Sequence, residues 1–144
     1  MVIAAPSANL AIVAHCGWKG VRLDLAGKSV RQLLAFGALA SDLSAAIGPG
    51  IGPASFEVGP EVLDQFATPY HLHTAWGTPS IDLPLLLMHQ LQQAGVEVDK
   101  IFPSPSDTFT DPQFHSHRRE QQLAGRNATV CIVSQDPSQL EKQP

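Results

Sequence analysis

The chain has 144 residues, 44% of them hydrophobic, and its formal net charge at pH 7 is −4. This length suits one compact domain, because two domains would each be too small to bury a stable core. The negative balance argues against a nucleic-acid partner, since clustered Lys and Arg supply most of the affinity for phosphates, and the single pair Arg118-Arg119 is too local to reverse it.

The sequence also lacks the signals of export and membrane insertion. No apolar run approaches the roughly 20 residues that cross a bilayer, and the N-terminus has no charged segment followed by an apolar stretch and a cleavage site. The two cysteines, Cys16 and Cys131, form neither a disulfide framework nor a CxxC metal spacing. We therefore expect a soluble, cytoplasmic protein in which Cys131, within ATVCIV, is a small core residue.

Strands and helices alternate in the first half of the chain. Residues 9–15 (NLAIVAH) predict a buried strand and the start of the sheet, residues 23–36 a helix that ends at Gly37, and residues 43–47 a second strand. The stretch GPGIGP (residues 48–53) cannot continue regular structure and is interpreted as a rigid corner that could also form the wall of a site. Pro60 then stands at the first position of a predicted helix.

Irregular segments dominate the second half. Residues 67–79 predict an irregular connection, and Asp82 is expected to cap a helix over residues 83–94. Residues 96–102 predict a strand, and residues 114–119 and 127–134 predict two further extended segments. The tail from Gln135 is polar. The expected fold class is α+β: a single domain over residues 1–134 with a mixed sheet flanked by helices, followed by a polar tail over residues 135–144.

The stretch AHCGWKG (residues 14–20) places a histidine and a cysteine at the end of the first predicted strand. A rigidly held His15 beside a glycine turn suits a metal ligand or a general base, and a core or capping histidine is the alternative. Cys16 could act as a nucleophile activated by His15. Successive side chains of a strand point to opposite faces, however, so this pair needs a turn or bulge, and burial is the alternative for Cys16.

Four more histidines form two pairs with a spacing of two, His71 with His73 and His115 with His117. On a strand this spacing puts both rings on one face, as a zinc site uses, but His71 and His73 lie where no strand is predicted and are interpreted as solvated. Arg118 and Arg119 beside His117 suit a phosphate or carboxylate, and a surface ion pair with Glu120 or Asp111 is the alternative.

Taken in order, AHCGWKG, IGPGIGPASFEVG and FHSHRRE followed by AGRNA resemble the C-terminal part of the multicopper polyphenol oxidoreductase, or laccase, family. Its motifs typically read HAGWRG, IGPxIGPxxxEVG and FFSYRRD or FxSHRR, and the resemblance covers roughly residues 8–133. It implies the family fold and the activities now associated with the family, purine nucleoside phosphorolysis and adenosine deamination.

The resemblance also implies residue roles. His15 would be one of three zinc ligands, two His and one Cys, and the zinc would polarise a water or a phosphate; copper is not expected. Lys19 stands where the family usually has Arg and, with Arg118 and Arg119, is a candidate for contacting a purine nucleoside or phosphate. The other two family ligands lie upstream of the first motif, so this chain, which begins near that strand, is expected to lack both.

Three hypotheses follow from this mismatch. The chain is a short enzyme with a rebuilt metal site that uses His15 with His117 or another of the paired histidines. Alternatively, it is a non-catalytic module whose open sheet edge is covered by a second copy or another chain, and a homo-oligomer is the expected state. The third hypothesis is a Cys-His hydrolase or deamidase with Cys16 or Cys131 as nucleophile, based on the similarity of the family fold to toxin deamidases.

Overall fold

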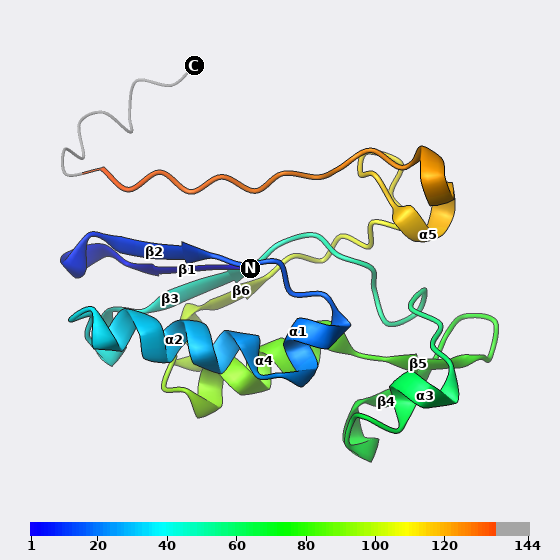
Figure 1. The fold of residues 1–144 in the computed structure, drawn as a ribbon, viewed down its shortest axis with the longest axis horizontal. Helices are drawn as coiled ribbons and strands as arrows, with labels where there is room; N and C mark the ends of the chain where they lie inside the picture. The colour runs from blue at the N-terminus through cyan, green and yellow to red at the C-terminus, as the bar shows by residue number, and fades with distance from the viewer. Residues whose placement is uncertain (135–144) are drawn as a thin grey trace.

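A four-stranded mixed sheet forms the centre of the molecule (Figure 1). The structure, a computed structural model, describes residues 1–134. The strands are β1 (Val2–Ala5), β2 (Leu10–Val13), β3 (Ser44–Ile47) and β6 (Ile101–Pro103). Their order is β2-β1-β3-β6; β1 is antiparallel to both neighbours, whereas β3 and β6 are parallel. The α+β fold class predicted from the sequence is confirmed.

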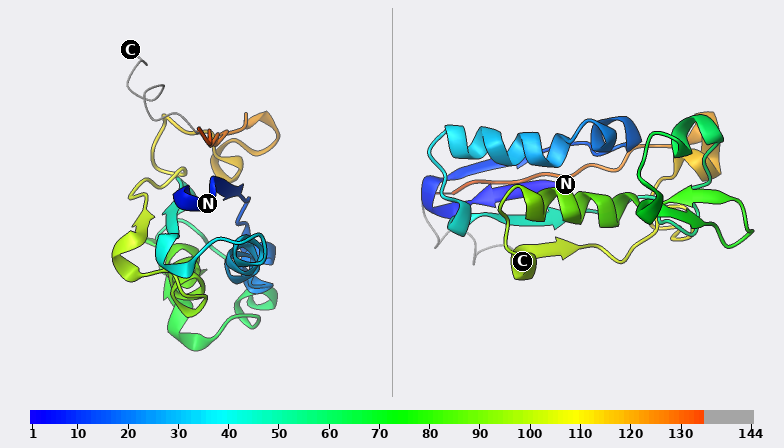
Figure 2. Two further views of the ribbon diagram at one scale, coloured as in Figure 1. Left: turned by 90° about the vertical axis from the view of Figure 1, so that its left-hand side faces the viewer. Right: turned by 90° about the horizontal axis from the view of Figure 1, so that it is seen from below.

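Two helices, α2 (Leu25–Ala35) and α4 (Leu83–Gln93), cover the same face of this sheet (Figure 2). Apolar residues recur at helical spacing on both, so each turns one stripe toward the strands. The row Ile12, Ile3, Ala45 and Ile101 runs across the four strands beneath them. Ile3 is fully buried and Ile101 is 6% exposed, so the core lies between this face and the helices.

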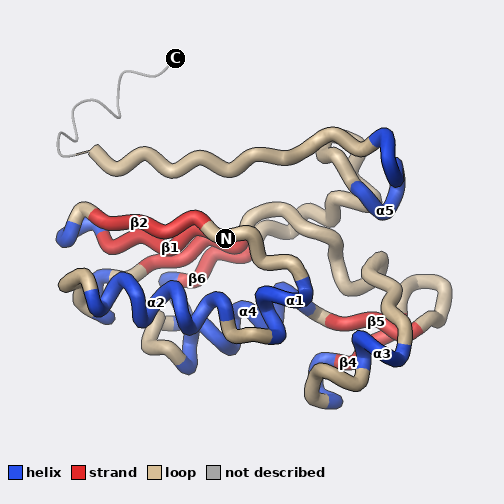
Figure 3. The backbone as a smooth tube through the Cα atoms, viewed as in Figure 1, coloured by secondary structure: helices blue, strands red, loops and turns tan. Residues whose placement is uncertain are grey.

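The opposite face of the sheet carries a second apolar row, and no helix within residues 1–134 covers it. Val13, Val2, Ala46 and Phe102 are aligned across the four strands by the same register. Val13 is 48% exposed and Phe102 is 59% exposed. After α5 (His117–Glu120) and a 3-10 turn, residues 124–134 run extended on this side of the sheet and are not part of any strand (Figures 1 and 3).

The N-terminal strand prediction was partly wrong. The predicted strand at residues 9–15 exists as β2 but covers Leu10–Val13, and β1 precedes it, so the sheet does not start at residue 9. Asn9 adopts a left-handed conformation (φ 56°) between the two strands, which a short polar side chain tolerates. Four residues before Pro6 are too few for a periodic signal in the sequence.

The helix predicted over residues 23–36 is two helices, α1 (Trp18–Arg22) and α2. Asp24 separates them with a left-handed backbone (φ 56°), and its carboxylate accepts a hydrogen bond from the Gly27 amide at 3.2 Å. Asp24 therefore caps α2, in the way that short acidic side chains satisfy the free amides of a first turn. The predicted helix over residues 83–94 is confirmed as α4, and Asp82 accepts from the Leu85 amide at 2.9 Å.

A two-stranded ribbon and a short helix lie at one end of the sheet. The helix α3 (Pro60–Leu63) begins at Pro60, as predicted. The ribbon joins β4 (His71–His73) to β5 (Pro79–Ile81), so residues 67–79 are not irregular throughout. Short 3-10 turns cover Pro6–Ala8, Ala40–Asp42, Thr68–Tyr70, Val98–Lys100 and Gln121–Leu123.

The later predictions of extended structure need two corrections. The segment predicted over residues 96–102 is a 3-10 turn followed by β6, which covers only Ile101–Pro103. Residues 114–119 are not extended throughout, because Ser116 accepts a hydrogen bond from the Arg119 amide (3.4 Å) and caps α5. Residues 127–134 are extended, as predicted, although they belong to no strand (Figure 3). The predicted tail lies outside the described residues. No helix within residues 1–134 is both long and apolar enough to span a membrane.

Candidate functional site

One pocket of about 230 Å³ lies between α1, the chain before and within α3, and α5. Trp18 forms one wall, and its ring also lies 5.5 Å from the Lys19 ammonium group. Arg118 forms another wall: its guanidinium lies 5.7 Å from the centroid of the Phe56 ring and donates to the Glu57 carbonyl oxygen at 3.0 Å. The full lining is Trp18, Phe56, Glu57, Val58, Gly59, Glu61, Val62 and Arg118.

The pocket brings together residues from the three sequence motifs. Trp18 belongs to AHCGWKG, the residues from Phe56 to Gly59 to the second motif, and Arg118 to FHSHRRE. The second motif was predicted to be a rigid corner that could also form a site wall, and it does line this pocket. Glu57 and Glu61 were not predicted as lining residues. Their signal was an acidic residue on each side of the Val58-Gly59-Pro60 turn, next to a predicted helix start.

Asp107 fixes the wall of loops beside this pocket. Its carboxylate accepts from the Ser55 hydroxyl at 2.6 Å and from the Phe109 amide at 2.9 Å, and the Thr108 amide donates to Gly50 at 2.9 Å. Partial burial raises the pKa of Asp107, but hydrogen bonds from Gly52, Ser55 and Phe109 outweigh it and hold the pKa below its usual range. The second motif is thereby tied to residues 107–109.

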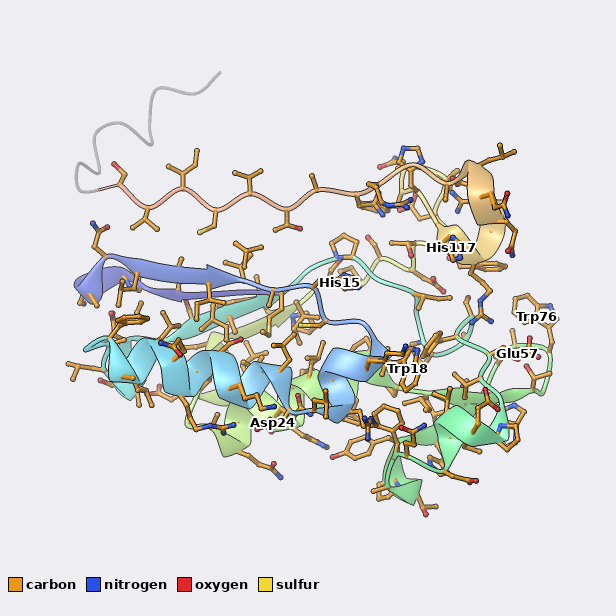
Figure 4. The ribbon with its side chains drawn as sticks, in the orientation of Figure 1. His15, Trp18, Asp24, Glu57, Trp76 and His117 are labelled. Atoms are coloured by element: carbon orange, nitrogen blue, oxygen red, sulfur yellow. The ribbon has the colours of Figure 1, made fainter. Side chains whose placement is uncertain are left out.

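His15 and Cys16 do not act on each other in this structure. The His15 side chain is exposed, and Figure 4 shows it apart from Trp18, Glu57 and His117. The Cys16 thiol contacts the Ala14 carbonyl oxygen at 3.7 Å, and burial raises the pKa of this thiol. A raised pKa keeps the thiol protonated at neutral pH, so this geometry does not favour the nucleophile hypothesis for Cys16.

The paired histidines make separate local contacts. His71 and His73 share one face of β4, and His71 Nε2 lies 2.8 Å from the Phe66 carbonyl oxygen. His117 Nδ1 lies 3.0 Å from the Gln121 carbonyl oxygen, and His115 lies beside Glu120. Within residues 1–134, no three His, Cys, Asp or Glu side chains form a group that could hold a metal ion. A catalytic zinc needs about three protein ligands, so the described residues do not fit one by themselves.

Arg118 and Arg119 have different roles in this structure. Arg119 donates to the carbonyl oxygens of Thr108 (2.9 Å) and Phe114 (2.6 Å) and pairs with Glu120. The hydrogen bond from Arg119 is the main cause that lowers the pKa of Glu120. Arg119 therefore holds the loops around α5 together, including the predicted ion pair with Glu120. Arg118 lines the pocket.

The fold and the order of the three motifs point to a single protein family, and comparison with known proteins identifies that family. Residues 1–134 match the family described as multi-copper polyphenol oxidoreductase laccase. The chain belongs to this family, which confirms the resemblance seen in the sequence.

Its relatives include proteins named purine nucleoside phosphorylase. One from Xylella fastidiosa is 34% identical over 140 residues, which cover 92% of this chain and 52% of the relative. YlmD from Geobacillus stearothermophilus is 35% identical over 135 residues, covering 85% and 48%. The solved structure of that YlmD matches with a TM-score of 0.75 at 34% identity, over 86% of this chain and 49% of the other. The chain spans about half the length of the curated relatives it matches.

Proposed function

We propose that this chain provides a binding wall for a purine nucleoside and phosphate in a protein that acts as a purine nucleoside phosphorylase. The observation that carries the proposal is the meeting of the three motifs in one pocket, with Trp18 and Arg118 on its walls. The names of the relatives supply the substrate class.

The chemistry of the lining residues fits such a ligand. Trp18 and Phe56 offer aromatic surface, on which the planar face of a purine packs favourably. Glu57 and Glu61 supply carboxylates that accept hydrogen bonds from ring or amino N–H groups. Arg118 is the proposed phosphate contact, because a guanidinium can donate two parallel hydrogen bonds to one phosphate. Lys19, above Trp18, adds positive charge near the pocket.

No catalytic step is assigned to zinc. His15 and His117 lie apart in Figure 4, and the described residues contain no three-ligand group. His15 stays the proposed acid–base or ligand residue of the family chemistry, and Arg119 a positioning residue that shapes the segment carrying Arg118. A phosphorylase that uses this chain with zinc therefore needs further ligands from outside residues 1–134.

The two tryptophans allow a direct binding test. Trp18 lines the pocket, whereas Trp76 lies elsewhere, 5.8 Å from the Phe109 ring. Titration with inosine or adenosine, once with and once without phosphate in the buffer, is expected to change the fluorescence emission of Trp18, and the change should be larger with phosphate. The change should persist in Trp76→Phe and disappear in Trp18→Phe, and Arg118→Gln should remove the dependence on phosphate. A signal that follows Trp76, or none from the wild-type chain, contradicts the proposed site.

A further inference from the structure

Gln90 is a polar side chain at a core-facing position of α4. It lies one turn after Leu86 and Leu87 and next to Leu91, all of which are buried. Its Nε2 donates to the Val21 carbonyl oxygen of α1 at 2.6 Å. Its Oε1 is buried and has no hydrogen-bond partner among the described residues. A half-paired amide in such a place costs stability, so the packing of the core does not explain a glutamine here.

The hydrogen bond from Gln90 is not needed to satisfy the end of α1. The Val21 carbonyl oxygen already accepts from the Asp24 amide at 3.0 Å, as the tightened last turn of a helix provides. What Gln90 adds is a fixed link between α4 and α1, two helices that pack against each other (Figure 1).

The helix α1 depends on such a link because its local sequence stabilises it little. It spans only Trp18–Arg22, its N-cap residue Gly17 has no side-chain acceptor, and Asp24 separates it from α2 with a left-handed backbone. Helices this short owe their stability to tertiary contacts. Trp18 lies one turn before Val21 on α1 and forms a wall of the pocket. A shift of α1 therefore moves that wall.

We propose that Gln90 is a positioning residue for the pocket, because its amide holds α1 in the orientation that places Trp18 on the pocket wall. Gln90 does not line the pocket and acts through α1. Side chains that break the pattern of a core are expected where they serve a functional site. The ligand of the pocket rests on the proposed function above, whereas the position of Trp18 is measurable without any ligand.

Fluorescence of Trp18 tests this role on the full chain carrying Trp76→Phe, which leaves Trp18 as the single tryptophan. Gln90→Leu keeps a side chain of similar size and removes the amide. It should lower the anisotropy of Trp18 and increase its quenching by acrylamide, without lowering the urea midpoint of unfolding. Gln93→Leu is the matched control, because Gln93 is exposed on the same helix and the substitution should change neither signal.

Two outcomes of this measurement overturn the proposal. One is a Gln90→Leu variant in which the anisotropy and quenching of Trp18 equal those of the unsubstituted background. The other is a lower urea midpoint for Gln90→Leu, because Gln90 would then support the core rather than position α1.

A second variant, Gln90→Glu, tests the donor itself. A carboxylate cannot donate to the Val21 carbonyl oxygen, but a protonated carboxyl can. The anisotropy of Trp18 should therefore be low at neutral pH and return as the pH falls through the pKa of the introduced carboxyl, which burial raises above about 4.3. Gln93→Glu should show no such return. A Gln90→Glu variant without it also overturns the proposal.

Inosine binding in the same background separates this role from the proposed function. Gln90→Leu should raise the Kd for inosine by about 2- to 10-fold, the range that weaker ring packing on Trp18 predicts. If Gln90→Leu binds as tightly as the unsubstituted background, the positioning role is wrong and the proposed function stands. If neither protein binds inosine but Trp18 is displaced in Gln90→Leu, the proposed function is wrong and the positioning role stands.

Discussion

The two faces of the central sheet differ in what covers them, although the same strands supply both. On one face the row through Ile3, Ala45 and Ile101 lies beneath α2 and α4, and none of these residues is more than 6% exposed. On the other face the row through Val13 and Phe102 is about half exposed. Strands that are apolar on both faces are typical of sheets covered on both sides. Because only the row of residues beneath α2 and α4 is removed from water, the stability of this chain is expected to come mainly from the helix-covered face.

The largest expected effect is on the helix-covered face. Leu91 on α4 is fully buried, so Leu91→Ala should lower the free energy of unfolding by about 2–5 kcal/mol, through lost burial and the cavity left behind. Leu39→Ala is the matched control, because Leu39 is 66% exposed and should change stability by about 0.5 kcal/mol or less. Urea unfolding measures both. Equal losses in the two variants would show that the helix-covered face is not the main source of stability.

The next effect concerns Asp107, which ties the loops beside the pocket. Asp107→Asn should cost about 1–3 kcal/mol of unfolding free energy at pH 7, because the neutral amide has one acceptor oxygen where the carboxylate uses two charged ones. The folded pKa of Asp107 lies below its unfolded value of about 3.9, so its contribution is present above that pH and is lost as the pH falls through the folded pKa. The difference between wild type and variant should therefore shrink below about pH 4. If the difference in unfolding free energy instead grows as the pH falls, the pKa of Asp107 is not lowered by folding.

A smaller effect is expected at the start of α4. Asp82→Ala removes the side chain that accepts from the Leu85 amide and should cost about 1 kcal/mol of unfolding free energy. Asp82→Asn keeps an acceptor at the same place and should restore most of the loss. Thermal unfolding followed by circular dichroism compares the three proteins. If Asn is as destabilising as Ala, the cap does not explain the effect.

The helix-covered layer was the more predictable part of the fold. Asp82, Gly95 and the apolar spacing of residues 83–94 carry a complete helix signal, and α4 matches it. The strand β1 was missed because four residues ahead of Pro6 show no period. The helix α5 was missed because its capping residue Ser116 lies within a run that reads as extended. Such short elements owe their form to tertiary contacts, here the Arg119 hydrogen bonds, rather than to local propensity.

The functional site, like the fold, could be predicted from the sequence only in part. The resemblance named Arg118 as a candidate contact, and the first motif contains Trp18; both residues line the pocket. The sequence could not show that Arg119, its neighbour, instead holds the carbonyl oxygens of Thr108 and Phe114, because that depends on how two loops fold back on α5. Nor could it show that Glu57 and Glu61 face Trp18 across about forty residues of chain. Long-range pairing of loops is the information that one sequence lacks.

The smallest effect is expected on the open face and completes the comparison. Val13→Ala should lower the unfolding free energy of the monomer by about 0.5 kcal/mol or less, because Val13 is 48% exposed. Val30→Ala, the same substitution at a fully buried residue of α2, should cost several times more. Chemical unfolding at low protein concentration separates the two. A side chain that is half in water has little burial to lose. If Val13→Ala nevertheless costs nearly as much as Val30→Ala, the open face of the sheet is already covered in the folded chain.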